Sequence, residues 1–353
     1  MTIATIYTTD ATPASPRVGK ELMNATRQFS VEVPWRSWWS VTSTLIILTC
    51  TLGIAAIAPW WPLRLAASVL GGLVLVRSFI LYHDYMHRSL LRDSRLAKPI
   101  FHLLGYLLLT PPRYWRHTHN YHHGNTGKPL NPDDENELLY TSDVGSFPLM
   151  TTERWRAASR AERLQYRIYR HPITMLLAYI TVFFFSATLL PFLKDPRKHW
   201  DGALAIVLHG AVIFCIWFFA GFDVLFFAFL LPFAISAATG SYLFFAQHNY
   251  EGMHILEPEE WTYYRGALES SSFLRLNRLM NWFTGNIGYH HIHHLNPLIP
   301  FYRLPEAMAA IPELRHPVTT SLKPRDIYGC LRLNLWDREK DELVTYRAGR
   351  LGT

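Results

Sequence analysis

Histidine is concentrated in three short stretches of this chain. The chain has 17 histidines among 353 residues, and they gather in HDYMH (83–87), HTHNYHH (117–123) and HHIHH (290–294). Imidazole is a common metal ligand in its neutral form. Three clusters of this density therefore indicate a metal centre rather than scattered surface histidines.

The spacing within each stretch suits a helix. His83 and His87 are four residues apart, which places both rings on one helical face. His119 and His290 are each followed by histidines three and four residues later. Neighbouring histidines project about 100° apart on a helix, so one stretch can serve two ions. Eight imidazoles are too many for one ion, and the pattern predicts two metals. Iron, zinc, copper and nickel all accept imidazole, so ligand type alone leaves the metal open.

Other uses of histidine fit less well. A single histidine near a helix end is usually a hydrogen-bonding or interfacial residue, but three stretches of matched spacing argue against that interpretation. The three cysteines, Cys50, Cys215 and Cys330, form no CxxC pair, which disfavours an iron–sulfur or structural zinc site. A haem protein would place paired histidines inside membrane spans, and only His209 lies in one, without an evident partner. A metal transporter would need polar ligands at the bilayer centre, where these spans have almost none.

Five apolar segments are long enough to cross a membrane, which takes about 20 residues. They are residues 41–61, 63–82, 172–193, 203–220 and 224–246. The first two join through Pro62 and the last two through residues 221–223, so the sequence predicts two helical hairpins. Arg64 and Arg77 lie near the ends of the second span, where their stems can snorkel.

Basic residues indicate the orientation. Four follow the first hairpin: Arg88, Arg92, Arg95 and Lys98. The turn at 221–223 has none, so the histidine-bearing ends should be cytoplasmic. If 172–193 also crossed, everything after residue 246 would lie outside, yet the loop 194–199 carries three basic residues. We therefore expect four spans, with 172–193 dipping into the membrane and returning or lying along its surface.

Two further segments are expected at the membrane interface. Residues 100–111 are apolar but too short to span. Residues 152–170 carry six arginines and two glutamates with aromatic and aliphatic residues between them. This pattern is typical of an interfacial helix on anionic headgroups, with a basic solvated helix as the alternative.

Composition agrees with a membrane protein. Half of the residues are hydrophobic, only 17% are charged, and the net charge is +7. Because the basic residues flank apolar segments, a membrane surface is favoured over nucleic acid as their partner. We expect a loose cytoplasmic tail over residues 1–38 without a visible signal peptide, a membrane domain with the metal site over 39–321, and a small cytoplasmic cap over 322–353.

The histidine stretches resemble the boxes of the membrane fatty acid desaturases, which have the patterns HDxxH, HxxHH and HxxHH. The matching motifs are HDYMHRS, WRHTHNYHH and NIGYHHIHHLNPLIPFYRL. AASRAERLQYRIYR, FFAQHNYE and SSFLRLNRLMNWFTGNIGYHH also resemble the bacterial acyl-lipid desaturases, and the likeness runs from about residue 70 to 305. It implies an all-α integral membrane protein with two hairpins, interfacial helices and a cytoplasmic, histidine-rich di-iron cap.

The resemblance implies nine iron ligands. They are His83, His87, His119, His122, His123, His248, His290, His293 and His294. Of these, His248 is identified by the resemblance alone. Second-shell carboxylates commonly orient a ligand ring, so Asp84 is expected to hold one, and Asn120 and Asn286 to help similarly. Within the boxes His117 and His291 are expected to be outer contacts or bystanders. The histidines expected to bind no metal are His102, His171, His199, His209, His254 and His316.

The resemblance further implies an enzyme of a bacterial inner membrane that puts a double bond into a lipid acyl chain, with two iron ions and dioxygen as co-substrate. The sequence has no glycine-rich dinucleotide fingerprint, so a separate protein should supply electrons, and a ferredoxin is favoured over cytochrome b5. The basic cytoplasmic face of the chain offers such an acidic protein a docking surface, with binding of lipid headgroups as the alternative. The alternatives are hydroxylation or ketolation of a carotenoid, sphingolipid or other lipid by the same centre, and a metal- or lipid-binding protein without catalysis. The sequence leaves open the position of the double bond, the carrier of the acyl group and the oligomeric state.

Overall fold

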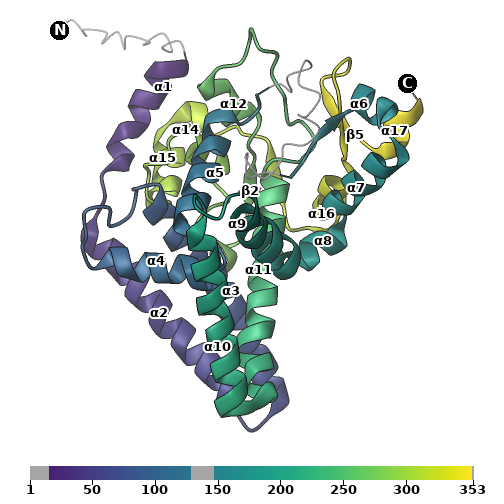
Figure 1. The fold of residues 1–353 in the computed structure, drawn as a ribbon. Coiled ribbons are helices and arrows are strands. Elements are labelled where there is room, and N and C mark those ends of the chain that lie inside the picture. Colours follow the sequence, from purple (N-terminus) through teal and green to yellow (C-terminus); the bar gives the residue numbers. More distant parts are fainter. Residues whose placement is uncertain (1–15, 129–146, 352–353) are drawn as a thin grey trace, which may run out of the picture.

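The structure, a computed structural model, describes residues 16–128 and 147–351. Long helices converge on a narrow end, whereas shorter helices and the strands gather at a wide end (Figure 1). Within the described residues, three helical runs are long and apolar enough to cross a membrane: Pro34–Ile57, Trp61–Met86 and Trp200–Gln247. The expected mostly helical membrane protein is thereby confirmed.

The first hairpin consists of α2 (Pro34–Ile57) and α3 (Trp61–Met86). Each helix has proline in its first turn, where the missing N–H costs no helical hydrogen bond. The expected spans 41–61 and 63–82 lie in this hairpin. However, α2 begins earlier, at Pro34, and α3 continues to Met86, so that His83 stands on helical backbone at the wide end.

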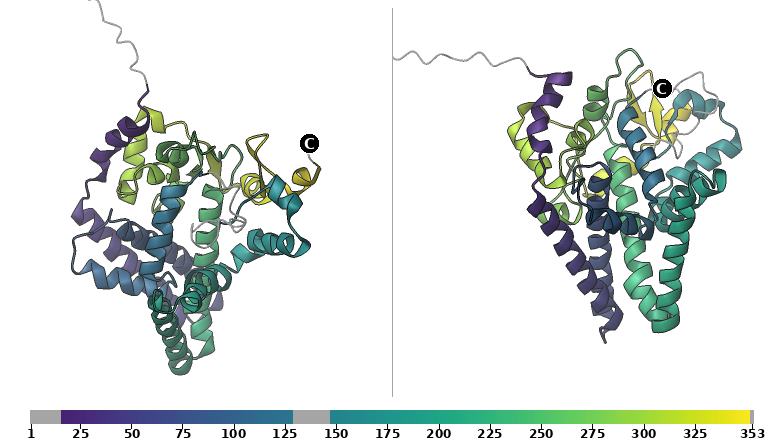
Figure 2. Two further views of the ribbon diagram at one scale, coloured as in Figure 1. Left: turned by 45° about the horizontal axis from the view of Figure 1, so that its top comes forward. Right: turned by 60° about the vertical axis from the view of Figure 1, so that its left-hand side comes forward.

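The second hairpin lies beside the first and points the same way (Figure 2). It consists of α10 (Trp200–Leu225), the π-helical turn η3 (Phe226–Leu230) and α11 (Leu231–Gln247). The helical run turns back at Gly221, whose φ of 84° lies in the left-handed region that glycine adopts without strain. The turn therefore lies where the sequence predicts it, between residues 220 and 224.

The two hairpins contact each other along α3 and α11 and at the narrow end. There, the Arg64 guanidinium pairs with the Asp223 carboxylate and lies 4.5 Å from the ring centre of Phe227. Arg77 does not snorkel as expected. Its side chain turns into the protein and donates to the Thr44 hydroxyl (3.0 Å) and to the Trp282 carbonyl oxygen, because it faces a short helix of the wide end.

The segment expected to dip into the membrane is interrupted. It comprises α8 (Pro172–Leu176), the π-helix η2 (Tyr179–Leu189) and α9 (Leu190–Lys194). Its apolar helical part, Tyr179–Lys194, is shorter than the roughly 20 residues of a span. The helix α4 (Ala97–Leu107) is shorter still and packs against α3 and α10. These lengths agree with the prediction that neither segment crosses the membrane.

The described part of the N-terminal segment is docked, so the expected loose tail over 1–38 is wrong for residues 16–33. The elements concerned are α1 (Gly19–Thr26), η1 (Arg27–Ser30), α12 (Tyr263–Glu269), α14 (His290–Leu295) and α15 (Leu304–Ala310). Leu22 and Phe29 are buried in one cluster with Ile292 and Leu295. This contact was missed because α1 is only two turns long, and its few apolar residues stand out only beside their partners.

Residues 152–170 form two helices rather than the single one expected. They are α6 (Thr152–Ala157) and α7 (Arg160–Arg170). Ser159 separates them, because its hydroxyl accepts the Glu162 N–H while the Glu162 carboxylate accepts the Ser159 N–H, a capping box that starts a new helix. Trp155 and Tyr166 are buried among residues of the C-terminal part, so they are not free to lie on headgroups.

Two small sheets fasten the C-terminal part to the rest. In the first, β4 (Leu335–Asp337) pairs in parallel with β1 (Met150–Thr151) and antiparallel with β5 (Glu342–Val344). In the second, β2 (Phe273–Arg275) pairs in parallel with β3 (Thr319–Ser321). The remaining helical elements of the described residues are α5 (Pro112–Asn125), α13 (Arg278–Phe283), η4 (Phe301–Arg303), η5 (Pro312–Leu314), α16 (Pro324–Arg332) and α17 (Tyr346–Leu351). The division into a membrane domain and a cap stays a prediction.

Candidate metal centre

Two groups of histidines converge at the wide end, within the described residues. The five-histidine group comprises His83, His87, His119, His123 and His293. The four-histidine group comprises His122, His248, His290 and His294. Within each group, one possible ligand atom per residue lies within 4.8 Å of all the others. The nine histidines that the resemblance implies are thus the nine that the fold brings together.

Helix geometry explains why the boxes divide between the groups. His122 and His123 are neighbours on α5, and His293 and His294 are neighbours on α14. Because successive residues of a helix point about 100° apart, each neighbour faces a different group. The end of α3 supplies only the five-histidine group, and His248, at the end of α11, supplies only the other. The expectation that one stretch can serve two ions agrees with this arrangement.

The ring nitrogens approach one another as ligands of a common ion would. In the five-histidine group, the Nε2 atom of His123 lies 3.2 Å from those of His119 and His293. In the four-histidine group, Nε2 of His290 lies 2.9 Å from His248 and 3.1 Å from His294. Two nitrogens bound at right angles, each about 2.1 Å from one ion, would lie about 3 Å apart.

The protonation states also fit a metal. Burial, together with the nearby histidines, holds the pKa values of His123 and His293 well below the usual value for histidine. Burial also lowers the pKa of His248 to about 4. These rings are therefore neutral, which is the form that binds metals. The Nε2 atom of His87 is buried without a hydrogen-bond partner among the described residues. Such an orphaned nitrogen costs free energy unless an ion occupies the space before it.

Oxygen atoms around the groups hold several rings through their second nitrogen. Asp84 Oδ1 lies 3.0 Å from His83 Nδ1, and its Oδ2 accepts the Phe301 N–H at 2.7 Å. This is the contact expected of Asp84. In the four-histidine group, His294 Nδ1 lies 3.1 Å from the Thr126 hydroxyl, and His248 Nδ1 lies 2.9 Å from the Ser270 carbonyl oxygen. Each contact leaves Nε2 to face the group, as in histidine–metal sites generally.

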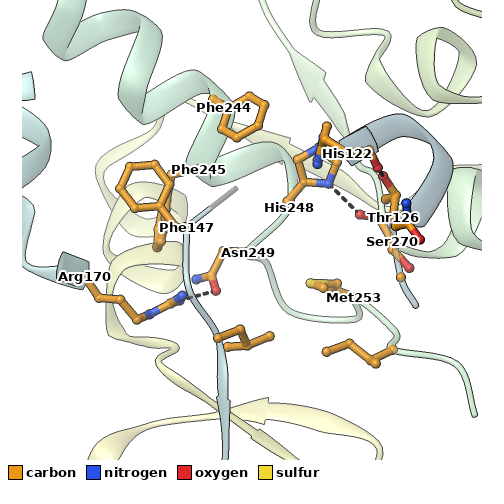
Figure 3. A pocket seen from close by; sticks show the side chains of 14 residues that line it. His122, Thr126, Phe147, Arg170, Phe244, Phe245, His248, Asn249, Met253 and Ser270 are labelled. Atoms are coloured by element: carbon orange, nitrogen blue, oxygen red, sulfur yellow. Dashed lines mark hydrogen bonds between the residues drawn. The ribbon is translucent and has the colours of Figure 1, made fainter. Parts of the chain in front are cut away.

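Aromatic side chains shield both groups. Trp115 stacks on His119 with ring centres 4.4 Å apart, and Phe244 lies 5.1 Å from His122. A cavity of about 50 Å³ lies beside the four-histidine group, bordered by His122, His248, Phe244 and Arg170 (Figure 3). The Arg170 guanidinium donates to the amide oxygen of Asn249, the residue after His248. An aromatic ring therefore covers part of each group.

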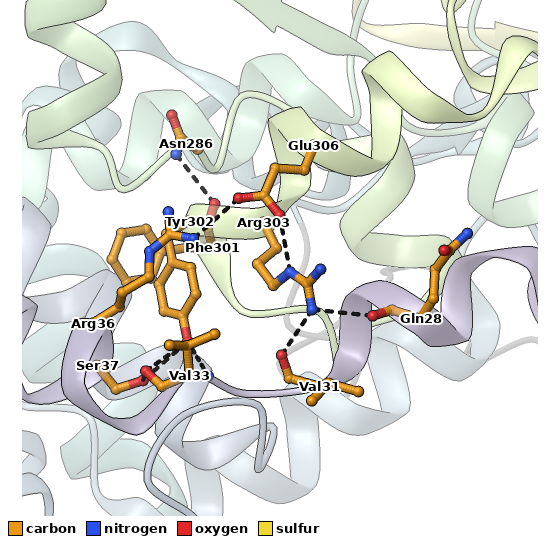
Figure 4. Close-up of polar contacts among 10 residues, drawn as sticks. All are labelled: Gln28, Val31, Val33, Arg36, Ser37, Asn286, Phe301, Tyr302, Arg303 and Glu306. Atoms are coloured by element: carbon orange, nitrogen blue, oxygen red, sulfur yellow. Dashed lines mark hydrogen bonds and ion pairs between the residues drawn. The ribbon is translucent and has the colours of Figure 1, made fainter.

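Several predicted residues lie elsewhere. Asn120 is exposed on α5, so the expected supporting contact is wrong: its neighbour His119 faces inward, and a residue 100° away faces out. Asn286 donates to the Phe301 carbonyl oxygen at 3.1 Å (Figure 4) and thus supports the loop that binds Asp84 rather than a histidine. His117 is exposed.

The histidines expected not to bind metal stay outside both groups. His291 is buried, and its Nε2 lies 3.1 Å from the Leu314 carbonyl oxygen. His209 has partners that the sequence did not reveal, the Tyr179 hydroxyl at 2.5 Å and the Leu107 carbonyl oxygen at 2.7 Å. Neither group includes any of the others: His102, His171, His199, His254 and His316.

Sequence reasoning missed Thr126 and Ser270. Thr126 follows His122 by four residues, so helical spacing could have placed its hydroxyl near the rings. Ser270 acts through its backbone carbonyl, which every residue has, and no side-chain pattern signals it.

Comparison with known proteins yields consistent matches. The family model described as "Fatty acid desaturase" matches residues 59–321, which include all three histidine stretches. A fatty acid desaturase of Bacillus subtilis is 33% identical over 81% of this chain and 78% of its own length. A temperature-sensitive sn-2 acyl-lipid omega-3 desaturase (ferredoxin) from Arabidopsis thaliana chloroplasts is 28% identical over 85% of this chain and 69% of its own length. The sn-1 oleoyl-lipid 12-desaturase of a Picosynechococcus species is 24% identical over 79% and 77%.

The family match spans α3, the second hairpin and the helices that carry the two histidine groups. The resemblance seen in the boxes therefore extends to most of the chain. This protein belongs to the fatty acid desaturase family and is an oxidoreductase.

Proposed function

We propose that this chain introduces a carbon–carbon double bond into a fatty-acyl chain carried by a membrane lipid, using dioxygen and two iron ions. The observation that carries the proposal is the convergence of histidines from four helices into two buried groups at one end of the membrane hairpins. Relatives from A. thaliana and Picosynechococcus are named as acyl-lipid desaturases, which supports a lipid-borne substrate.

Each histidine group would hold one iron ion. Asp84 fixes the ring of His83, and Thr126 and the Ser270 carbonyl fix His294 and His248. When bound, the iron pair supplies the dioxygen chemistry by which two hydrogens leave adjacent methylene carbons. The chain's own residues keep the ligand rings neutral and oriented, while aromatic walls such as Trp115 exclude water from the reacting carbons.

The reaction needs two electrons beyond those removed from the acyl chain, and we propose that a ferredoxin delivers them at the cytoplasmic face. The A. thaliana relative is named as ferredoxin-dependent. Arg113 and Arg116 are exposed on α5, the helix whose buried face carries His119 and His123. Basic residues on a helix that also carries ligands suit an acidic electron carrier. The cytoplasmic orientation rests on the basic residues that follow the first hairpin.

The test is lipid analysis of a desaturase-deficient bacterium that expresses this chain with a ferredoxin system. Fatty esters are derivatised at their double bonds and read by mass spectrometry. We expect a new unsaturated fatty acid with the parent chain and with His117→Ala, an exposed histidine of the second box, but none with His293→Ala. Hydroxylated or keto lipids in place of new double bonds would overturn desaturation in favour of the related oxidations.

A further inference from the structure

A second hollow is larger than the cavity beside the four-histidine group. It has a volume of about 660 Å³ and is bordered by the start of α2, the second half of α3, α13 and the loop before α15. Its border includes Trp35 and Ser43, which lie eight residues apart on α2, so the hollow runs along about 12 Å of that helix. Figure 4 shows one side of it, where Arg36 lies over the ring of Tyr302.

The lining of this hollow is cationic. Arg36, Arg77 and Arg278 border it, and none of the described aspartates or glutamates does. Arg36 forms an ion pair with Glu306 at 3.1 Å. Arg77 is 5% exposed, and among the described residues its guanidinium bonds to neutral oxygens and lies 4.4 Å from the ring centre of Trp282. A buried cation without an anion is costly, so the hollow favours a negatively charged occupant.

The open side of the hollow faces the level of lipid headgroups. Trp35 and Trp39 border it and are 71% and 68% exposed. Both lie in the first two turns of α2, at the end of a helix that is apolar enough to span a membrane. Exposed tryptophans at such an end typically mark the membrane–water interface. An occupant therefore enters from the bilayer side.

The hollow also adjoins the metal centre. Phe301 and Tyr289 border it. The N–H of Phe301 binds Asp84, which holds His83, and Tyr289 directly precedes His290. A lipid held here would contact residues that bind Asp84 or directly precede a ligand of the four-histidine group.

We propose that this hollow binds the phosphate and glycerol ester region of a phosphoglycerolipid whose acyl chain is the substrate. The proposal rests on the function proposed above and adds the chemical class of the carrier. Arg278, exposed at the edge, and Arg36 bind the phosphate, while Arg77 supplies positive charge at the bottom. Arginine suits this role because its planar guanidinium binds phosphate oxygens in pairs.

The test measures lipid binding by the purified full-length chain in detergent, read by native mass spectrometry. The probes are dipalmitoyl phosphatidylglycerol and dipalmitoylglycerol, which has the same acyl chains without phosphate. Arg278→Gln removes the exposed cation, and Arg275→Gln is the matched control, an exposed arginine three residues away that does not border the hollow. We expect Arg278→Gln to weaken phosphatidylglycerol binding about tenfold, the effect of losing one charge-assisted contact. Dipalmitoylglycerol binding and the control variant should be unchanged.

Equal weakening for both lipids, or unchanged phosphatidylglycerol binding, would overturn the proposal. Palmitoyl-coenzyme A forms a third arm, because its phosphates offer the same chemistry from a soluble carrier. If Arg278→Gln weakens only palmitoyl-coenzyme A binding, the lipid assignment is wrong. Binding is measured without turnover, so failure here differs from failure of the proposed function, which would show as lipid binding without new double bonds.

Discussion

Asp84 links the metal centre to the loop at Phe301 with both carboxylate oxygens. Without it, the His83 ring loses its orienting partner and a buried N–H loses its acceptor. We predict that Asp84→Ala lowers iron affinity by about 10- to 100-fold, the usual effect of removing such a partner. Iron per chain, measured by plasma mass spectrometry after dialysis against a weak chelator, checks this. The control is Asp93→Ala, an exposed carboxylate nearby. Equal iron retention in both variants would show that Asp84 is dispensable.

At the scale of residues, the sequence predicts contacts within one helix better than contacts between helices. The pairing of His119 with His123 follows from their spacing. The partnership of His123 with His293 depends on how α5 meets α14, and no local pattern encodes that angle. His248 stands alone in its segment, so the family resemblance was needed to identify it. Asn120 shows that a position next to a ligand in sequence does not ensure contact with the metal centre, because His119 faces inward and Asn120 is exposed.

Among the elements, α14 is only six residues long and depends on its neighbours for its position. Asn296, directly after it, is buried and donates to the Thr26 hydroxyl at 2.8 Å and to the Ser30 hydroxyl at 3.0 Å. We predict that Asn296→Ala destabilises the protein by about 1–3 kcal/mol, because the buried Thr26 hydroxyl and the half-buried Ser30 hydroxyl lose a partner. Thermal unfolding in detergent should show a lower midpoint for Asn296→Ala than for the control Gln28→Ala. The Gln28 side chain makes an exposed contact with the Ala25 carbonyl oxygen. Equal midpoints would mean that the N-terminal segment does not brace α14.

Length and composition predict the long elements, since an apolar run of span length has few alternatives to a membrane helix. The hairpins and the turn at Gly221 follow from this. Short elements are harder, because α1 and β1 acquire their burial only from partners far along the chain. Residues 152–170 show the same difficulty: their basic composition suggested one surface helix, whereas the capping box at Ser159 ends one helix and starts another.

On the scale of the whole molecule, the two hairpins are tied at the narrow end by Arg64 and Asp223. The Arg64 side chain is nearly buried, while that of Asp223 is 70% exposed. We predict that Asp223→Asn lowers stability by between ~0.5 and ~3 kcal/mol, the range between an exposed and a buried pair. Thermal unfolding in detergent checks this, with Asp195→Asn, in the exposed loop before α10, as the control. No difference between the two variants would mean that helix packing alone joins the hairpins.

The most direct test of a two-iron centre counts iron in the purified chain and in variants of each histidine group. We predict two iron ions per chain, one in each group, and the same count for His117→Ala. The double variant His122→Ala with His290→Ala removes two of the four ligands in one group and should leave a single iron in the other. A parent chain that holds one iron, or a double variant that still holds two, would contradict a centre built from two separate groups.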